Sequence, residues 1–322
     1  MVNARGMTVE LTGRGAAIVR IALAEADGRL TEMVVGPPAL AGLIASARRY
    51  GAIVGRYAGR LRGSVEIAGQ RHDLAVNASG VTLHGGDPGF DRALWSARPF
   101  ETADTIGVAF THVSRDGDQG FPGTLSVTAR YTLARHADAL TLDITATADR
   151  PTIANMTNHV YFDLSGGRGL GCQTLTVDAP RRVAIDARKL PTGTLPAVAG
   201  TPLDFTRGRA LAGVIADGGV DEMLVLGRSR TARLTDRPTG RVLTLTTDQP
   251  GLQVFTGNGF DGTDRDRAGR PIVRHAGIAL EPGNFSDAPN VRGFPDARVA
   301  PGRSYRWRAT WHFTREAAQP CR

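Results

Sequence analysis

Four segments of the chain place side chains able to move a proton or bind a polar ligand next to strand ends or glycines. In TNHVYFDLSG, residues 157–166, a histidine stands inside an apolar and aromatic run. Successive side chains of a strand point to opposite faces, so the apolar Val160 and Phe162 share one face and His159 lies on the other. The second face is polar and aromatic and consists of Asn155, Thr157, His159, Tyr161 and Asp163. His159 is therefore either a packed, hydrogen-bonded histidine or a proton donor in a polar cavity.

A carboxylate ends a second candidate strand, in GIALEPGNFSDAPN, residues 277–290. Glu281 is followed by Pro282 and Gly283, which end the strand beside a loop rich in Gly, Pro and Asn. A carboxylate in that position serves as a general base or is a strand-end glutamate exposed to water. The segment alone does not decide between the two.

Two further segments combine glycines with basic side chains. His84 precedes a Gly-Gly pair in VTLHGG, where backbone can approach a ligand closely. In GRYAGRLRG, Arg56, Arg60 and Arg62 share parity on an extended segment, which predicts several guanidinium groups on one face. Taken separately, each segment is also explained by a tight turn or a solvated basic edge.

The elements that must position these side chains are antiparallel strands. Residues 124–133 and 139–148 alternate apolar and polar residues around a polar turn, which predicts a hairpin. Residues 304–313, SYRWRATWHF, alternate in the same way. Helical spacing is confined to residues 38–49, a short helix or a loop, and glycines and prolines are spread as turn punctuation. We predict an all-β fold, one antiparallel β-sandwich domain over residues 1–322 with few short helices.

Composition restricts the partners. The net charge of +8 is carried by dispersed arginines, and Lys189 is the only lysine, so nucleic-acid binding is not favoured, whereas a phosphorylated substrate stays open. Cys172 and Cys321 are expected to form neither a disulfide framework nor a metal site. The chain has no signal-like apolar segment and no apolar run long enough to cross a bilayer. We therefore predict a cytoplasmic protein without a membrane partner.

Seven segments between Gly55 and Asn290 resemble, in one order, those of the aldose 1-epimerases (galactose mutarotase-like family). GRYAGRL resembles GRxxxRI, VTLHGG and GFD resemble LHGGxxGFD, and NHVYFDL resembles NHSYFNL. DGDQGFPG is similar to DGEEGYPG, and LPTGTLPAVAGTPLDF to PTGxxxPVxGTPxDF. PGLQVFTGN is similar to PGxQxYTGN, and LEPGNFSDAPN to LExQxxPDAxN.

This resemblance implies a β-supersandwich whose groove binds a free sugar, and an enzyme that interconverts the α and β anomers of a hexose without cofactor or metal. It makes Glu281 the base that takes the proton of the anomeric hydroxyl and His159 the acid that protonates the ring oxygen. The residues it implies for sugar binding are Arg60, His84, Asp221 and Gln253.

The resemblance leaves the sugar and the assembly open. Gly59 replaces an asparagine of the family, and Glu222 follows Asp221 where many members have histidine. A hexose-phosphate 1-epimerase of the same fold is one alternative, favoured by arginines at the pocket. A non-catalytic sugar-binding relative is the other, and the acid–base pair argues against it. A monomer or a homodimer is expected.

Overall fold

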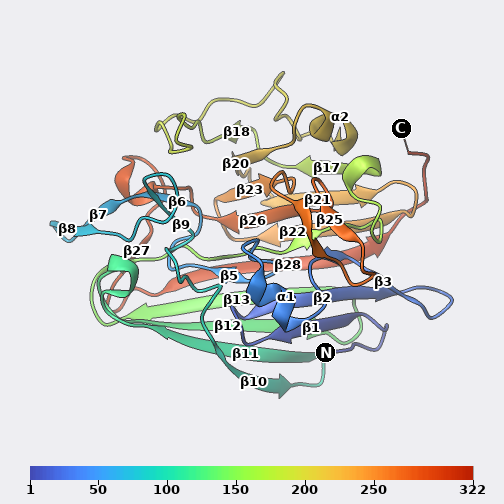
Figure 1. Ribbon diagram of the computed structural model, residues 1–322, viewed down its shortest axis with the longest axis horizontal. Coiled ribbons are helices and arrows are strands. Elements are labelled where there is room, and N and C mark those ends of the chain that lie inside the picture. Colours follow the sequence, from blue (N-terminus) through green and yellow to red (C-terminus); the bar gives the residue numbers. More distant parts are fainter. Residues whose placement is uncertain (322) are drawn as a thin grey trace.

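Two large antiparallel sheets form the body of the computed structural model, which describes residues 1–321 (Figure 1). The nine-stranded sheet has the order β10 (Ser96–Glu101), β11 (Thr105–Ser114), β12 (Leu125–Ala134), β13 (Ala139–Ala148), β28 (Tyr305–Arg315), β22 (Arg241–Thr247), β21 (Thr231–Asp236), β17 (Gln173–Val177) and β19 (Arg209–Ala210). The six-stranded sheet has the order β18 (Arg181–Arg182), β20 (Asp221–Val225), β23 (Gly251–Phe255), β26 (Ile278–Gly283), β16 (Tyr161–Phe162) and β4 (Val34–Val35).

Smaller elements surround these sheets. A three-stranded sheet contains β1 (Thr8–Thr12), β2 (Ala17–Ala24) and β3 (Leu30–Glu32). The two-stranded pairs are β5 (Ile53–Val54) with β15 (Thr157–Asn158), β6 (Arg60–Arg62) with β9 (Val81–Leu83), β7 (Ser64–Ile67) with β8 (Gln70–Asp73), β14 (Thr152–Ile153) with β27 (Arg298–Val299), and β24 (Asp261–Arg265) with β25 (Pro271–Val273). The helices are α1 (Leu40–Ala45) and α2 (Leu211–Ala216), and the 3-10 turns are η1 (Asp118–Gly120), η2 (Leu170–Cys172) and η3 (Ala288–Asn290).

The strands predicted from alternation are confirmed. β12 and β13 form the expected hairpin, in which Leu125 pairs with Ala148 and Leu133 with Leu140. β28 lies between β13 and β22, so the last strand of the chain joins the two halves of the nine-stranded sheet. The expected helix is present as α1, six residues long, none of them buried. The all-β prediction with few short helices therefore holds.

The main core lies between the sheets and draws on residues from Met7 to Phe313. The largest buried side chains include Trp307 and Trp311 of β28. The indole N–H of Trp307 donates to the carbonyl of Pro282 in β26, at 2.8 Å. A buried tryptophan usually finds such an acceptor, and here the acceptor belongs to the other sheet. This bond therefore fixes the position of β26 against the nine-stranded sheet.

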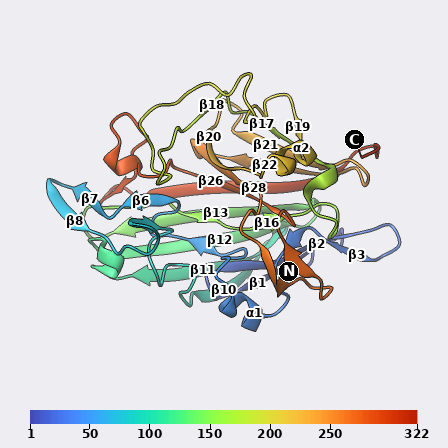
Figure 2. The same ribbon diagram turned by 45° about the horizontal axis from the view of Figure 1, so that its top comes forward.

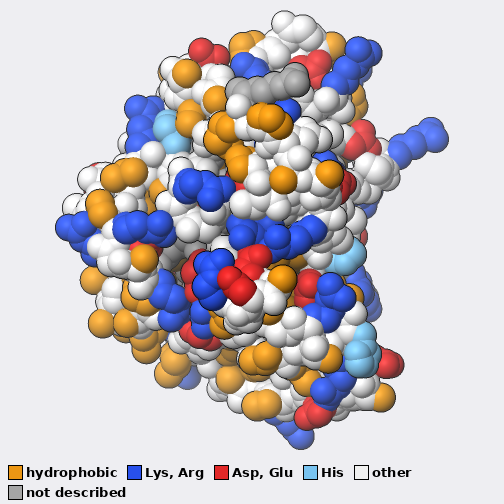
Figure 3. Space-filling view, turned by 90° about the vertical axis from the view of Figure 1, so that its right-hand side faces the viewer, with side chains coloured by type: hydrophobic (Ala, Val, Ile, Leu, Met, Phe, Trp, Pro, Cys, Tyr) orange, Lys and Arg blue, Asp and Glu red, His pale blue; other side chains and the backbone are white. Residues whose placement is uncertain are grey.

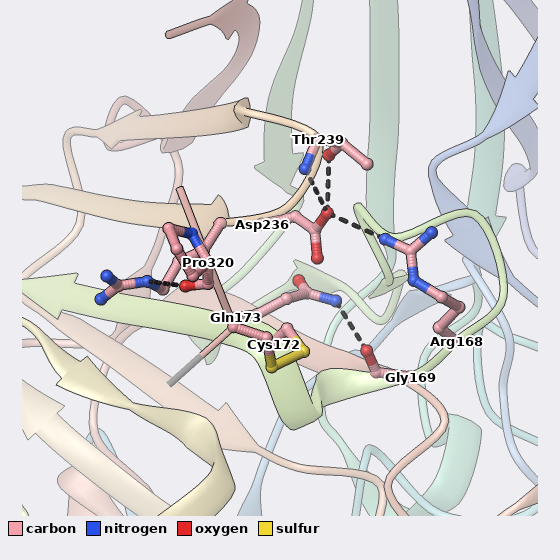
Figure 4. The surroundings of a disulfide bond; sticks show 9 residues. Arg168, Gly169, Cys172, Gln173, Asp236, Thr239 and Pro320 are labelled. Atoms are coloured by element: carbon pink, nitrogen blue, oxygen red, sulfur yellow. Dashed lines mark hydrogen bonds and ion pairs between the residues drawn. A yellow bond between two sulfur atoms is a disulfide. The ribbon is translucent and has the colours of Figure 1, made fainter. Parts of the chain in front are cut away.

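The two cysteines form a disulfide, so the expectation that they would not pair is wrong. Cys172 ends η2 just before β17, and Cys321 lies in the C-terminal tail, 149 residues further on (Figure 4). The tail follows β17 and β21 because the Gln319 N–H donates to the carbonyl of Arg237, and Arg237 Nε donates to the carbonyl of Pro320. The pairing depends on this tertiary path, which no local spacing of cysteines encodes.

Acidic and basic side chains are mixed on one face of the molecule. On the face drawn in Figure 3, Lys and Arg lie interspersed with Asp and Glu instead of forming one basic patch. Ion pairs such as Arg267–Glu10, at 3.0 Å, join distant parts of the chain. Within residues 1–321, no helix is long and apolar enough to cross a membrane. The β7–β8 hairpin projects from one end of the molecule (Figures 1 and 2).

Loss of the disulfide is expected to lower thermal stability without removing the fold. A cross-link across 149 residues reduces the conformational entropy of the unfolded chain, which stabilises the folded state by about 5 kcal/mol in the loop-entropy model. Losing it corresponds to a decrease in melting temperature on the order of 10 °C. The Cys172→Ser, Cys321→Ser double variant and the reduced wild type should show the same decrease by differential scanning fluorimetry. Adding reductant to the double variant is the control and should change nothing. An unchanged melting temperature in the double variant contradicts this assignment.

Candidate active site

One cavity of about 220 Å³ collects all six side chains that the sequence predicted for the site. Arg60 begins β6, His84 directly follows β9, and His159 lies between β15 and β16. Asp221 belongs to β20, Gln253 to β23 and Glu281 to β26. Their positions span more than two hundred residues of sequence. The fold therefore brings together residues that no single segment contains.

Three neighbouring strands of the six-stranded sheet form the polar floor of this cavity. Gln253 of β23 is paired directly with Glu281 of β26. Asp221 begins β20, on the other side of β23, and Gln253 Nε2 donates to its Oδ1 at 2.7 Å. Asp221 and Gln253 are diagonal neighbours on these adjacent strands, and long side chains in such positions reach one another. The register of these strands thus places two carboxyl groups and an amide on one surface.

The segment that carries His159 follows the predicted alternation, although it is not one continuous strand. Residues 157–158 pair with β5, and residues 161–162 pair with β26 and β4. Between them, the N–H of His159 donates to the carbonyl of Ala52 and its carbonyl accepts from Gly51, both at 2.9 Å. Val160 and Phe162 enter the core, and the side chain of His159 faces the cavity. The other predicted members of the polar face also line the cavity, except Asp163, which accepts from backbone N–H groups of its own turn.

His159 and Glu281 face each other in the cavity and have no other side-chain partner. The His159 Nε2 atom lies 3.7 Å from Glu281 Oε1, and both residues are about 95% buried. Among the described residues, neither side chain takes part in a hydrogen bond, and His159 Nδ1 is buried without a partner. A strand-end glutamate exposed to water is therefore excluded. Two buried groups without partners leave their hydrogen-bonding capacity for a ligand.

Burial controls the charge of this pair. It lowers the pKa of His159 to about 4, and the positive charge of Arg49 adds to the effect. It raises the pKa of Glu281 to about 8, and the negative charge of Asp221 adds to that shift. Desolvation disfavours the charged form of each group. Near neutral pH, the site therefore contains a neutral imidazole opposite a protonated carboxyl group instead of an ion pair.

His84 is held as a neutral ring with a defined tautomer. Its Nδ1 accepts a hydrogen bond from the backbone N–H of Gly59 at 3.3 Å, so Nε2 carries the ring proton. Burial, together with the charge of Arg49, lowers the pKa of His84 well below its usual value. The glycine after it serves packing and not ligand approach, since a Cβ on Gly85 would lie 2.0 Å from the carbonyl oxygen of Gly55.

The prediction that Arg56, Arg60 and Arg62 share one face is wrong for Arg56, whereas Arg60 and Arg62 are two residues apart in β6. Of these three arginines, only Arg60 lines the cavity, with Nη2 3.8 Å from Asp221 Oδ2. Arg56 is buried elsewhere and donates to backbone carbonyls that include that of Pro122, and Arg62 pairs with Asp287 at 2.5 Å. The shared parity fails for Arg56 because the segment becomes a strand only at residue 60.

Three basic residues at the site were not predicted. Arg48 and Arg49, between α1 and β5, line the cavity, and Lys189 makes an ion pair with Asp221. Lys189 carried a weak signal as the only lysine of the chain. Arg49 is one of 38 arginines and gave no signal in the sequence. Its own backbone is in the left-handed region, with φ of 56°, and this conformation, on which its position depends, is not encoded in a strand pattern.

The chain is similar to known epimerases over nearly its whole length. The model of the aldose 1-epimerase family matches residues 1–311. Galactose mutarotase from Homo sapiens is 33% identical over 309 residues, covering 93% of this chain and 89% of that protein. Aldose 1-epimerase from Escherichia coli (strain K12) is 31% identical over 330 residues, covering 98% and 94%.

Solved structures agree. An aldose epimerase homologue from C. elegans superposes with a TM-score of 0.90 at 25% identity, covering 98% of both chains. Galactose 1-epimerase from Lactobacillus acidophilus NCFM superposes with a TM-score of 0.86 at 26% identity, covering 98% of this chain and 93% of that one. Fold and matches together define an isomerase with the galactose mutarotase-like fold. The chain belongs to the aldose 1-epimerase family, and its activity is the mutarotation of an aldose.

Glu281→Gln is expected to stabilise the fold near neutral pH. The unfolded carboxyl group ionises near its ordinary pKa of 4.5, whereas the buried group keeps its proton up to about pH 8. Because the pKa is raised, Glu281 lowers the free energy of unfolding more and more as pH rises from about 4.5 to about 8. At pH 7 this loss is about 3 kcal/mol. The variant avoids this loss, so its advantage in urea unfolding should be absent at pH 4 and grow toward pH 8. A variant less stable than wild type at pH 8 contradicts this account.

Proposed function

We propose that Glu281 and His159 carry out the two proton transfers of the mutarotation. The observation that carries this assignment is the buried pair itself, 3.7 Å apart and without other partners in a cavity of about 220 Å³. Ring opening requires a base at the anomeric hydroxyl and an acid at the ring oxygen. Positioned groups contribute roughly 10²–10⁴-fold to such a transfer. The aldehyde end then rotates, and the ring closes on its other face with the roles reversed.

The pair is suited to both directions because between about pH 4 and pH 8 it holds one proton in total. With that proton on His159, Glu281 accepts the hydroxyl proton while His159 protonates the ring oxygen. The result is neutral His159 and protonated Glu281, which is the state that burial favours. From this state, Glu281 protonates the aldehyde oxygen, and His159 takes the hydroxyl proton during closure. No proton is gained or lost over the cycle.

The remaining residues orient the sugar. His84 offers the Nε2 proton of a neutral ring, which donates to a sugar oxygen. Asp221 and Gln253 form one hydrogen-bonded unit beside Glu281 and provide acceptors and donors for hydroxyl groups. Arg60 also lines the cavity and provides further donors near Asp221. The cavity is small, which suits a single sugar ring better than an oligosaccharide.

A free hexose is the proposed substrate. The names of the relatives point to galactose, which is an aldose with the anomeric hydroxyl and ring oxygen that the pair requires. The non-catalytic alternative does not account for the pair, because a site that only binds sugar has no use for a buried, protonated glutamate that destabilises the fold.

Cellular location and assembly stay predictions from the sequence. The cytoplasm was expected, and a monomer or homodimer. The Cys172–Cys321 disulfide argues for an oxidising compartment, because disulfides persist there and are rare in the cytosol. Labelling of free thiols in freshly lysed cells distinguishes the two locations, since a cytoplasmic protein would expose both thiols.

Removing either member of the pair is expected to abolish most of the activity. Glu281→Gln and His159→Gln should each lower kcat by about 10²–10⁴-fold in the polarimetric mutarotation of fresh α-D-galactose or α-D-glucose. Glu222→Gln is the matched control, because Glu222 is on the same strand as Asp221 but pairs with Arg182 outside the cavity. If wild type leaves the rate at the buffer value for every aldose tested, the catalytic assignment fails.

The pH dependence of kcat/KM is expected to be a broad bell. Below about pH 4 the pair holds two protons, so Glu281 is already protonated and cannot act as the base. Above about pH 8 it holds none, so the acid is missing. Activity should therefore rise through about pH 4 and fall through about pH 8, and both limits belong to the pair as a unit. Stopped-flow polarimetry across this range is the measurement, and a single limb centred near pH 6.5 contradicts the proton count.

A further inference from the structure

One buried hydroxyl group in the cavity wall has a donor without an acceptor. Ser286 follows β26 and lines the cavity, and only 9% of its surface is exposed. A serine hydroxyl provides one donor and two acceptor sites. The Oγ atom accepts a hydrogen bond from the backbone N–H of Arg60 at 3.3 Å, but among residues 1–321 the hydroxyl donates none. Buried donors are normally satisfied, so this one is available to a bound ligand.

The glycine before Arg60 leaves room for this hydroxyl group. Gly59 also lines the cavity, and its backbone has φ of 79°. A Cβ atom on Gly59 would lie 2.6 Å from Ser286 Oγ, which is closer than van der Waals contact allows, whereas the next nearest atom, Ser286 Cβ, would be 3.6 Å away. A side chain at position 59 would therefore turn the hydroxyl away from the N–H of Arg60. The hydroxyl occupies space that such a side chain would need.

Two departures from the motifs of the family meet at this point. Gly59 replaces an asparagine of the family, and Ser286 stands where the motif LExQxxPDAxN has proline. An asparagine side chain carries donors and an acceptor, whereas a proline side chain carries neither. This chain has the reverse arrangement, with no side chain at position 59 and a hydroxyl at position 286. A polar group is thus supplied by the segment after β26 in place of one from the segment before β6.

The backbone that holds Ser286 also holds a residue expected to bind the sugar. The N–H of Gly59 donates to Nδ1 of His84 at 3.3 Å, and the next N–H, that of Arg60, donates to Ser286. In the proposed function, His84 and Arg60 bind oxygen atoms of the sugar, and Glu281 acts at C1. We propose that Ser286 is a further sugar-binding residue, whose hydroxyl donates a hydrogen bond to one hydroxyl group of the aldose other than the anomeric one. This inference rests on the sugar binding proposed for the cavity.

The experiment compares anomer exchange of galactose and of its 2-, 3-, 4- and 6-deoxy derivatives by saturation-transfer NMR. Ser286→Ala should raise KM for galactose by about three- to tenfold, the effect of losing one neutral hydrogen bond. It should leave kcat within about twofold, because a contact made equally in ground state and transition state changes KM alone. For one deoxy sugar, variant and wild type should have the same KM. That sugar identifies the hydroxyl group to which Ser286 donates.

Ser64→Ala is the matched control, since Ser64 of β7 lies outside the cavity wall, and it should leave KM for every sugar unchanged. An equal increase of KM for galactose and all four deoxy sugars in Ser286→Ala overturns the proposal, because it indicates a role in packing alone. An unchanged KM overturns it too. If wild type binds galactose without turning it over, the catalytic assignment fails instead, and Kd values from calorimetry then test Ser286 in the same way. A wild type that binds no sugar contradicts both.

Gly59→Asn provides a second test from the other side of the contact. Asparagine is among the residues that best tolerate a left-handed backbone, and its Cβ should displace the hydroxyl of Ser286. Ser286→Ala should therefore raise KM for galactose in the wild-type background but have no further effect in the Gly59→Asn background. Such non-additivity is expected of residues in contact. Equal effects in both backgrounds contradict the placement of the hydroxyl beside Gly59, and the proposal with it.

Discussion

The site depends on a carboxyl group buried without a hydrogen-bond partner. Glu281 occupies the middle of β26, every residue of which is buried. Desolvation holds the proton on this group to about pH 8 and opposes folding at neutral pH. Such a residue persists only where the surrounding structure supplies the missing stability. Here the support is the strand's place between β23 and β16 in the six-stranded sheet, and the bond from Trp307 to Pro282 that ties β26 to the opposite sheet.

The charges around the pair oppose one another and so keep both protonation states within reach. Asp221 raises the pKa of Glu281 further, whereas Arg49 and Arg60 lower it. Arg49 also disfavours a proton on His159.

Local periodicity predicted the strands, and long-range contacts decided what it left open. The period of two is a property of a few consecutive residues, so it placed the β12–β13 hairpin and the cavity face of His159 correctly. It failed for Arg56, whose partners include the carbonyl of Pro122, 66 residues away. It could not pair Cys172 with Cys321 for the same reason. The six site residues were assigned together only through the family resemblance, because no periodicity links positions in separate strands. Their chemical roles and the single-domain division stay predictions.

Residues of the two large sheets contribute to one core, and a buried side-chain amide links the parts of the site that strand pairing does not join. The cavity is lined by side chains from β6, β20, β23 and β26. Strand pairing fixes the relative positions of β20, β23 and β26 but not that of β6. β6 pairs with β9 and not with the six-stranded sheet, yet Arg60 must face Asp221. Asn155 bridges this gap, since it donates to the carbonyl of Ala58 and accepts from the N–H of Asn284. A buried amide thus sets the distance between the wall that carries Arg60 and the strand that carries Glu281, because a change on either side leaves a buried polar group unpaired.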